Sequence, residues 1–142
     1  MITKTNKKEY IYLPQIVKDD KTSALHLLRV EAREKFTKIE FGYQTKAYYD
    51  RGGWINISPD TYLKTTNGQK LKITKAENIP YAPDQHHFET TVDYIFFSLY
   101  FPPLPQGTDS IDLIEADDSG SDWFNFMKID LGLRKGFLPG KE

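Results

Sequence analysis

The amino-acid sequence predicts an all-β fold, and three features carry this prediction. Side chains follow a period of two at 36–45, 70–74 and 94–101, as in β-strands, where successive side chains point to opposite faces. Aromatic residues, which favour pleated strands, make up 14% of the chain. Clusters of Gly, Pro, Asn and Asp separate the alternating runs and are typical of turns.

The N-terminal part predicts three strands. Residues 11–17 form a strand that Pro14 interrupts, which suits an edge or a bend. Residues 23–31 fit a strand or a short helix, and we predict a strand because the run is short and its neighbours are strands. The apolar residues of 36–45 share one face, so we expect the other face to be solvated.

The middle of the chain predicts a short strand and a hairpin. The strand at 54–57 follows a Gly-rich turn. The hairpin at 61–74 contains Asn67 and Gly68, which both tolerate positive φ, as a type I′ turn requires. Residues 78–92 are expected to form a long irregular connection.

The strand predicted at 94–101 is apolar on both faces. One face carries Ile95, Phe97, Leu99 and Phe101, and the other carries Tyr94, Phe96 and Tyr100. Neither face has a charge, so we predict a central strand that is covered on both sides. A proline-rich corner at 101–105 ends this strand, and shorter strands follow at 111–113 and 123–129.

Together these elements predict an immunoglobulin-like, two-sheet antiparallel β-sandwich. The chain contains no cysteine, so the disulfide of antibody-type domains is missing. We expect a disordered N-terminal segment at 1–9, a single β-sandwich domain at 10–131 and a C-terminal tail or linker at 132–142.

Several segments resemble a β-sandwich domain of exported, multidomain proteins of Bacteroidetes. They are WINISPDTYL at 54–63, AENIP at 76–80, FPPLP at 101–105, SIDLIE at 110–115 and MKIDL at 127–131. The resemblance covers roughly residues 10–131 and implies a noncatalytic interaction or accessory module with no catalytic residues. One departure is Asn78, where the family usually has Gly; Asn also tolerates a left-handed turn.

The charge balance argues against two classes of partner. The formal net charge is −1, which gives no overall field to hold nucleic acid or an anionic membrane. No apolar run is long enough to span a bilayer, and residues 1–8 do not form a signal peptide as they stand. We therefore expect an extracytoplasmic protein, periplasmic or on the cell surface, if a signal segment is missing from this chain, and a cytoplasmic one otherwise.

No pattern in the chain predicts catalysis, a cofactor or a metal site. The adjacent His86 and His87 would point apart in an extended segment, and the acidic run 117–122 lacks the spacing of a calcium loop. We expect exposed histidines and an ordinary turn, with a weak cation at 117–122 as the alternative. The alternative function is a small glycan-acting hydrolase whose carboxylates are assembled across strands.

The candidate binding surface comprises Tyr48, Tyr49 and Trp54. These aromatic residues flank the flexible turn at Gly52 and Gly53, where a sandwich commonly presents contact residues. A protein or a glycan is the expected partner there. The competing interpretation is that the three rings pack against the core or its rim.

Overall fold

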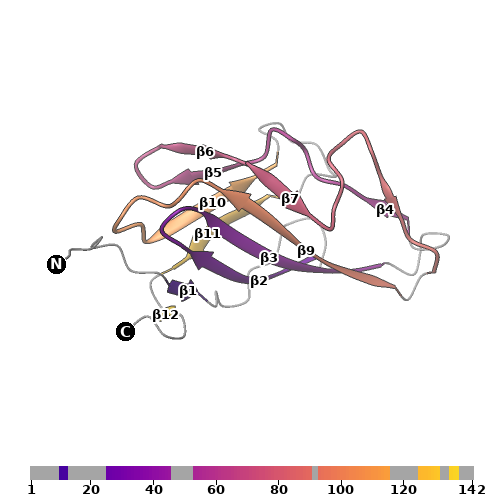
Figure 1. The fold of residues 1–142 in the computed structure, drawn as a ribbon, viewed down its shortest axis with the longest axis horizontal. Helices are drawn as coiled ribbons and strands as arrows, with labels where there is room; N and C mark the ends of the chain where they lie inside the picture. Colours follow the sequence, from indigo (N-terminus) through magenta and orange to yellow (C-terminus); the bar gives the residue numbers. More distant parts are fainter. Residues whose placement is uncertain are drawn as a thin grey trace.

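The computed structural model describes residues 10–12, 25–45, 53–90, 93–115, 125–131 and 135–137, which form strands and turns and no helix (Figure 1). The largest sheet contains β1 (Tyr10–Tyr12), β2 (Leu25–Ala32), β3 (Thr37–Gln44), β7 (Lys75–Glu77), β9 (Tyr94–Phe101) and β12 (Lys135–Phe137), in the order β12-β1-β2-β3-β9-β7. A second sheet contains β5 (Tyr62–Thr65), β6 (Lys70–Lys72), β10 (Ser110–Ile114) and β11 (Phe126–Asp130), in the order β11-β10-β5-β6. A small third sheet pairs β4 (Trp54–Ile55) with β8 (His86–His87).

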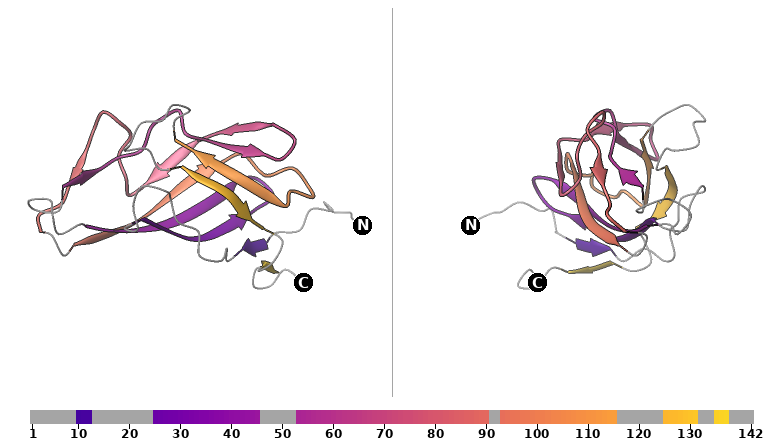
Figure 2. Two further views of the ribbon diagram at one scale, coloured as in Figure 1. Left: turned by 180° about the vertical axis from the view of Figure 1, so that it is seen from behind. Right: turned by 90° about the vertical axis from the view of Figure 1, so that its right-hand side faces the viewer.

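The two larger sheets face each other across one apolar core. In Figure 1, β10 and β11 lie behind β3 and β9, and the view from behind in Figure 2 reverses this order. Phe41 of β3 contacts Phe126 of β11 across the core, with ring centroids 5.8 Å apart. The strand pairs within both sheets are antiparallel. The all-β prediction is confirmed, and the layers are arranged as in a β-sandwich.

The strand β9 agrees with only half of its prediction. It lies inside the six-stranded sheet, between β3 and β7, and its inward residues Phe97 and Leu99 are buried as predicted. The prediction that both faces are covered was wrong, because Tyr94 is 61% exposed and Phe96 is 56% exposed. In the described part of the chain no further layer covers this part of β9, so Tyr94 and Phe96 meet solvent.

The predicted hairpin is present as β5 and β6, but its turn differs from the prediction. Only Gly68 has a positive φ, of 89°, whereas a type I′ turn needs two such residues. Gly68 donates its backbone N–H to the Thr65 carbonyl (2.9 Å), and Thr65 donates its backbone N–H to the Gln69 carbonyl (2.9 Å). This is a three-residue connection in which Gly occupies the left-handed position. Asn67 accepts a hydrogen bond from the Thr65 hydroxyl instead of adopting positive φ.

Between β6 and β9 the chain is more regular than the sequence suggests. Directly after β6 it leaves the four-stranded sheet and forms β7 at the edge of the six-stranded sheet, a strand that the sequence analysis missed. The segment 78–92 also contains β8, where His86 and His87 pair with β4. In the proline-rich corner, Thr37 donates its hydroxyl to the Pro102 carbonyl (3.0 Å), and the chain crosses from β9 to β10.

Both ends of the described chain add strands to one side of the six-stranded sheet. β1 pairs with β2 and with β12, so it is not an edge strand. The segment 132–142, expected to be a tail or linker, supplies β12. In the part of the chain that the structure describes, no helix could cross a membrane.

Candidate binding face on the six-stranded sheet

The outer face of the six-stranded sheet, which points away from the core, has a charged half. Its most buried acid is Glu31 of β2, which is 4% exposed and accepts hydrogen bonds from Arg29 (2.8 Å) and Arg33 (3.1 Å). Arg29 also donates to Glu40 of β3 (3.0 Å). Burial alone would raise the pKa of Glu31. The hydrogen bond from Arg33 and the charges of Arg29 and Lys38 oppose burial, and the pKa of Glu31 lies below its usual value.

Tyr100 of β9 joins the charges of β3 to those of β7. Its hydroxyl donates to Glu77 (2.7 Å), and this hydrogen bond, with the nearby Lys75, lowers the pKa of Glu77. Lys75 and Lys38 place their Nζ atoms 5.2 and 5.7 Å from the centre of the Tyr100 ring. We name this set the charged cluster, and it comprises Arg29, Glu31, Arg33, Lys38, Glu40, Lys75, Glu77 and Tyr100.

The other half of the same face is apolar. Phe96 of β9 lies directly opposite Gly42 of β3, and a Cβ atom on Gly42 would be only 3.2 Å from the Phe96 ring. The Phe96 ring therefore covers Gly42, and the missing side chain of Gly42 leaves room for the ring. Tyr94 meets Phe96 edge to face, with centroids 5.2 Å apart, and Leu28 of β2 lies on the far side of Gly42. We name these four residues the apolar strip.

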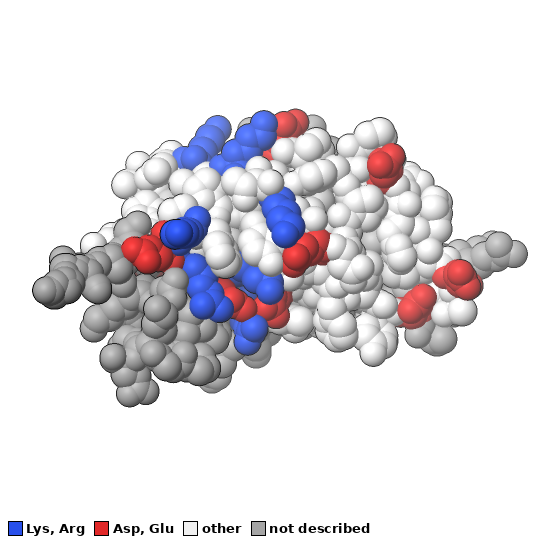
Figure 3. All heavy atoms as spheres, viewed as in Figure 1, with Lys and Arg blue, Asp and Glu red and all other residues white. Residues whose placement is uncertain are grey.

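A β-bulge places Leu28 in the apolar strip. Leu27 pairs with Phe41 and Arg29 pairs with Glu40, so Leu28 is the extra residue between two consecutive pairs. Leu28 is 43% exposed. In Figure 3 most charged side chains gather over β2, β3 and β7, and the part of the face towards β4 shows only scattered acidic residues.

A shallow depression of about 200 Å³ lies where the two halves meet. Leu28 and Phe96 line its apolar side, and Glu40, Glu77, Asn78 and Ser98 line its polar side. Ser98 lies between the two glutamates in the sheet, because it pairs with Glu40 on β3 and with Glu77 on β7. Both carboxylates already accept hydrogen bonds from the charged cluster, from Arg29 and from Tyr100. The depression can therefore contact a ligand, but it offers no free acid and base.

Of the candidate surface that the sequence analysis selected, the structure describes only Trp54, which lies outside the six-stranded sheet. Trp54 is 48% exposed and lies opposite His87 in the small β4–β8 sheet. Tyr48, Tyr49 and the acidic run 117–122 lie outside the described residues. The contact surface at Tyr48, Tyr49 and Trp54 thus stays a prediction. Among the residues that are described, no three His, Cys, Asp or Glu side chains form a group that could hold a metal ion.

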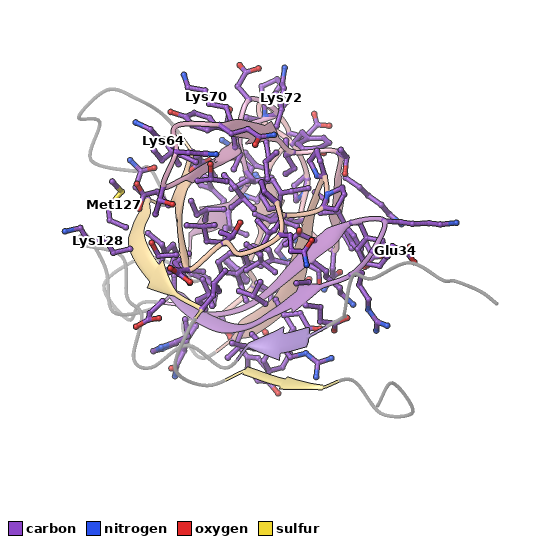
Figure 4. All side chains as sticks on the ribbon, turned by 90° about the vertical axis from the view of Figure 1, so that its left-hand side faces the viewer. Glu34, Lys64, Lys70, Lys72, Met127 and Lys128 are labelled. Atoms are coloured by element: carbon purple, nitrogen blue, oxygen red, sulfur yellow. The ribbon has the colours of Figure 1, made fainter. Side chains whose placement is uncertain are left out.

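The outer face of the four-stranded sheet is basic in appearance but partly neutralised. Figure 4 shows Lys64, Lys70, Lys72 and Lys128 on this side, together with the exposed Met127. Lys72 pairs with Asp60 (3.4 Å), and Asp112 accepts the backbone N–H of Lys128 (2.7 Å). Lys70 lies over the Tyr62 ring, 4.9 Å from its centre. Among its described residues this face therefore presents mixed charges and no cluster of exposed aromatic rings.

Comparison of the chain with protein-family models, curated proteins and solved structures finds no match. The resemblance to the Bacteroidetes domain therefore stays a prediction. The case for a function depends on the two outer faces alone. Of these, the outer face of the six-stranded sheet combines exposed aromatic rings, a depression and fixed polar groups.

Proposed function

We propose that this chain is a noncatalytic binding module, an immunoglobulin-like β-sandwich that holds a protein partner against the outer face of its six-stranded sheet. The observation that carries this proposal is the exposed aromatic pair Tyr94 and Phe96 beside Leu28. Protein interfaces commonly have such a centre of aromatic and aliphatic side chains. Monomeric soluble proteins seldom leave large contiguous apolar patches on their surface.

The charged cluster supports the same proposal as the polar rim of an interface. Its side chains already hold one another in place through several ion pairs, so a partner would meet a largely preorganised surface. Mixed charges of this kind also suit a protein with complementary charges better than a uniformly anionic polymer. The resemblance to the Bacteroidetes domain supports an accessory role in an exported, multidomain protein.

The glycan-acting hydrolase has weaker support. A general acid for glycoside hydrolysis needs a raised pKa. The pKa values of Glu31 and Glu77 are instead lowered by their hydrogen bonds and ion pairs. The carboxylates of the depression are bound to Arg29 and Tyr100, so neither is positioned as a free catalytic group.

Site-specific photocrosslinking tests the proposed function. The full chain would carry p-benzoylphenylalanine at position 96 or, as a matched control, at the equally exposed position 127 of the other sheet. After irradiation in an envelope extract of the source organism, we expect a discrete protein adduct from position 96 alone, and its loss when Leu28→Asp is added. A carbohydrate adduct, equal labelling from both positions, or no adduct from position 96 would contradict a protein partner on this face.

A further inference from the structure

We propose that the partner binds as an extended peptide strand that pairs with the edge of β9 at residues 94–96. This inference rests on the proposed function, because it specifies how a partner would occupy the outer face. Among the described residues, no strand pairs with this edge of β9 at residues 94–96. β9 pairs with β3 along its full length, but β7 covers β9 only at residues 98–100.

The chain leaves the β9 edge abruptly at Asn78. This residue has a φ of 64°, which turns the backbone away from the sheet after Glu77. The side-chain amide of Asn78 lies at the β9 edge and donates a hydrogen bond to the Phe96 carbonyl (2.6 Å). One polar group of the uncovered edge is thus satisfied by a side chain and not by a neighbouring strand.

The hydrogen-bond directions identify which other groups are open. Thr45 donates its backbone N–H to the Asp93 carbonyl (2.9 Å), so the odd-numbered residues of β9 exchange hydrogen bonds with β3. The backbone groups of Tyr94 and Phe96 point to the opposite side. The Tyr94 N–H donates a hydrogen bond to the side-chain carboxylate of Asp93 (2.8 Å). The Phe96 N–H and the Tyr94 carbonyl have no hydrogen-bond partner among the described residues.

This donor and this acceptor are what an added strand requires. Pairing along an exposed edge supplies main-chain hydrogen bonds, and alternate side chains supply specificity. Ligand residues opposite Tyr94 and Phe96 would both point outward, onto the exposed aromatic rings. The ligand is therefore an extended segment with apolar side chains at alternate positions, and with a free backbone N–H opposite Tyr94.

The partial capping of this edge explains why it suits a short peptide. Native sheets protect long open edges, because these pair readily with other sheets. Here Asn78 and Asp93 occupy two backbone groups and leave two open over a length of three residues. A single extended segment fits this length, whereas a second sheet edge would meet Asn78 and β7.

Selection from a displayed library of random eight-residue peptides tests this mode of binding on the full chain. We expect enriched peptides with alternating apolar residues. Methylating the backbone nitrogen that faces Tyr94 should weaken binding at least tenfold, whereas methylating its neighbour should have little effect. Phe96→Ala should weaken binding at least tenfold, and Met127→Ala should leave it unchanged. On binding, the Phe96 amide should become protected from hydrogen exchange.

Asn78→Gly gives a second variant that should keep the fold, since Gly accepts the positive φ. It frees the Phe96 carbonyl, so we expect binding to tighten severalfold. The proposed strand addition would be wrong if no peptide is enriched, if Phe96→Ala leaves the affinity unchanged, or if methylation of each backbone nitrogen leaves it unchanged. In these cases a positive crosslink from position 96 would keep the proposed function, and a negative one would remove both.

Discussion

Two neighbouring phenylalanines of β9 allow a direct test of the architecture. Phe97 is 3% exposed and stacks on Phe41, with ring centroids 5.0 Å apart, whereas Phe96 is 56% exposed. Phe97→Ala should leave a cavity and cost about 3–5 kcal/mol of unfolding free energy. Phe96→Ala loses only about half of the 1.5–3 kcal/mol that full burial provides and leaves no cavity, so its cost should be about 1 kcal/mol.

Chemical denaturation of both variants and the parent protein measures this difference. The comparison is well controlled, because the residue type, the strand and the substitution are the same. If the slope of the unfolding free energy against denaturant concentration is the same in all three proteins, their unfolded states are comparable. If Phe96→Ala cost as much as Phe97→Ala, the outer face of β9 would have to be covered, and the reasoning about the apolar strip would fail.

Three further predictions concern stability. Gly42→Ala should change the free energy of unfolding more favourably in the Phe96→Ala background than in the parent protein, by about 0.5 kcal/mol or more, because the close contact at 3.2 Å is then gone. A double-mutant cycle in urea measures this difference. Gly68→Ala should cost about 1–2 kcal/mol through its φ of 89°, since no atom lies within 4 Å of the added methyl group; equal melting temperatures would contradict this. Because the pKa of Glu31 is lowered in the folded state, the unfolded state binds more protons below about pH 4.5, and the free energy of unfolding should decrease as the pH is lowered through that range. The decrease should be smaller in Glu31→Gln, which chemical denaturation at several pH values would show.

The sequence was sufficient to predict most strands, because their period is local. β2, β3, β5, β6, β9 and β10 all lie where the sequence analysis predicted strands. β7 was missed because three residues, Lys75–Glu77, contain too little pattern to distinguish a strand from a turn. Its pairing with β9 is a tertiary effect that no local signal encodes.

The error on β9 has a specific cause. Its aromatic outer face was interpreted as covered, although the same analysis predicted a solvated face for 36–45. The structure pairs Gly42 of that strand with Phe96, so the two residues share one outer face. The available signal was Gly42 itself, a small residue on a face predicted to be solvated, which leaves room for a ring from a neighbouring strand. The bulge at Leu28 and the hydrogen bond from Asn78 could not be predicted, because both depend on register.

The order in which the chain visits its two large sheets has a consequence for folding. It moves from β3 to β5 and β6 in the opposite sheet, returns for β7 and β9, and crosses again to β10 and β11. Neither sheet is built from one continuous segment, so completing either sheet requires pairing between strands that are separated in the chain by strands of the other sheet. Such nonlocal pairing is slow to form, on the order of milliseconds to seconds, and is lost in a single cooperative transition. A strand bound at the β9 edge would therefore slow the unfolding of the whole sandwich, including the sheet that it never touches.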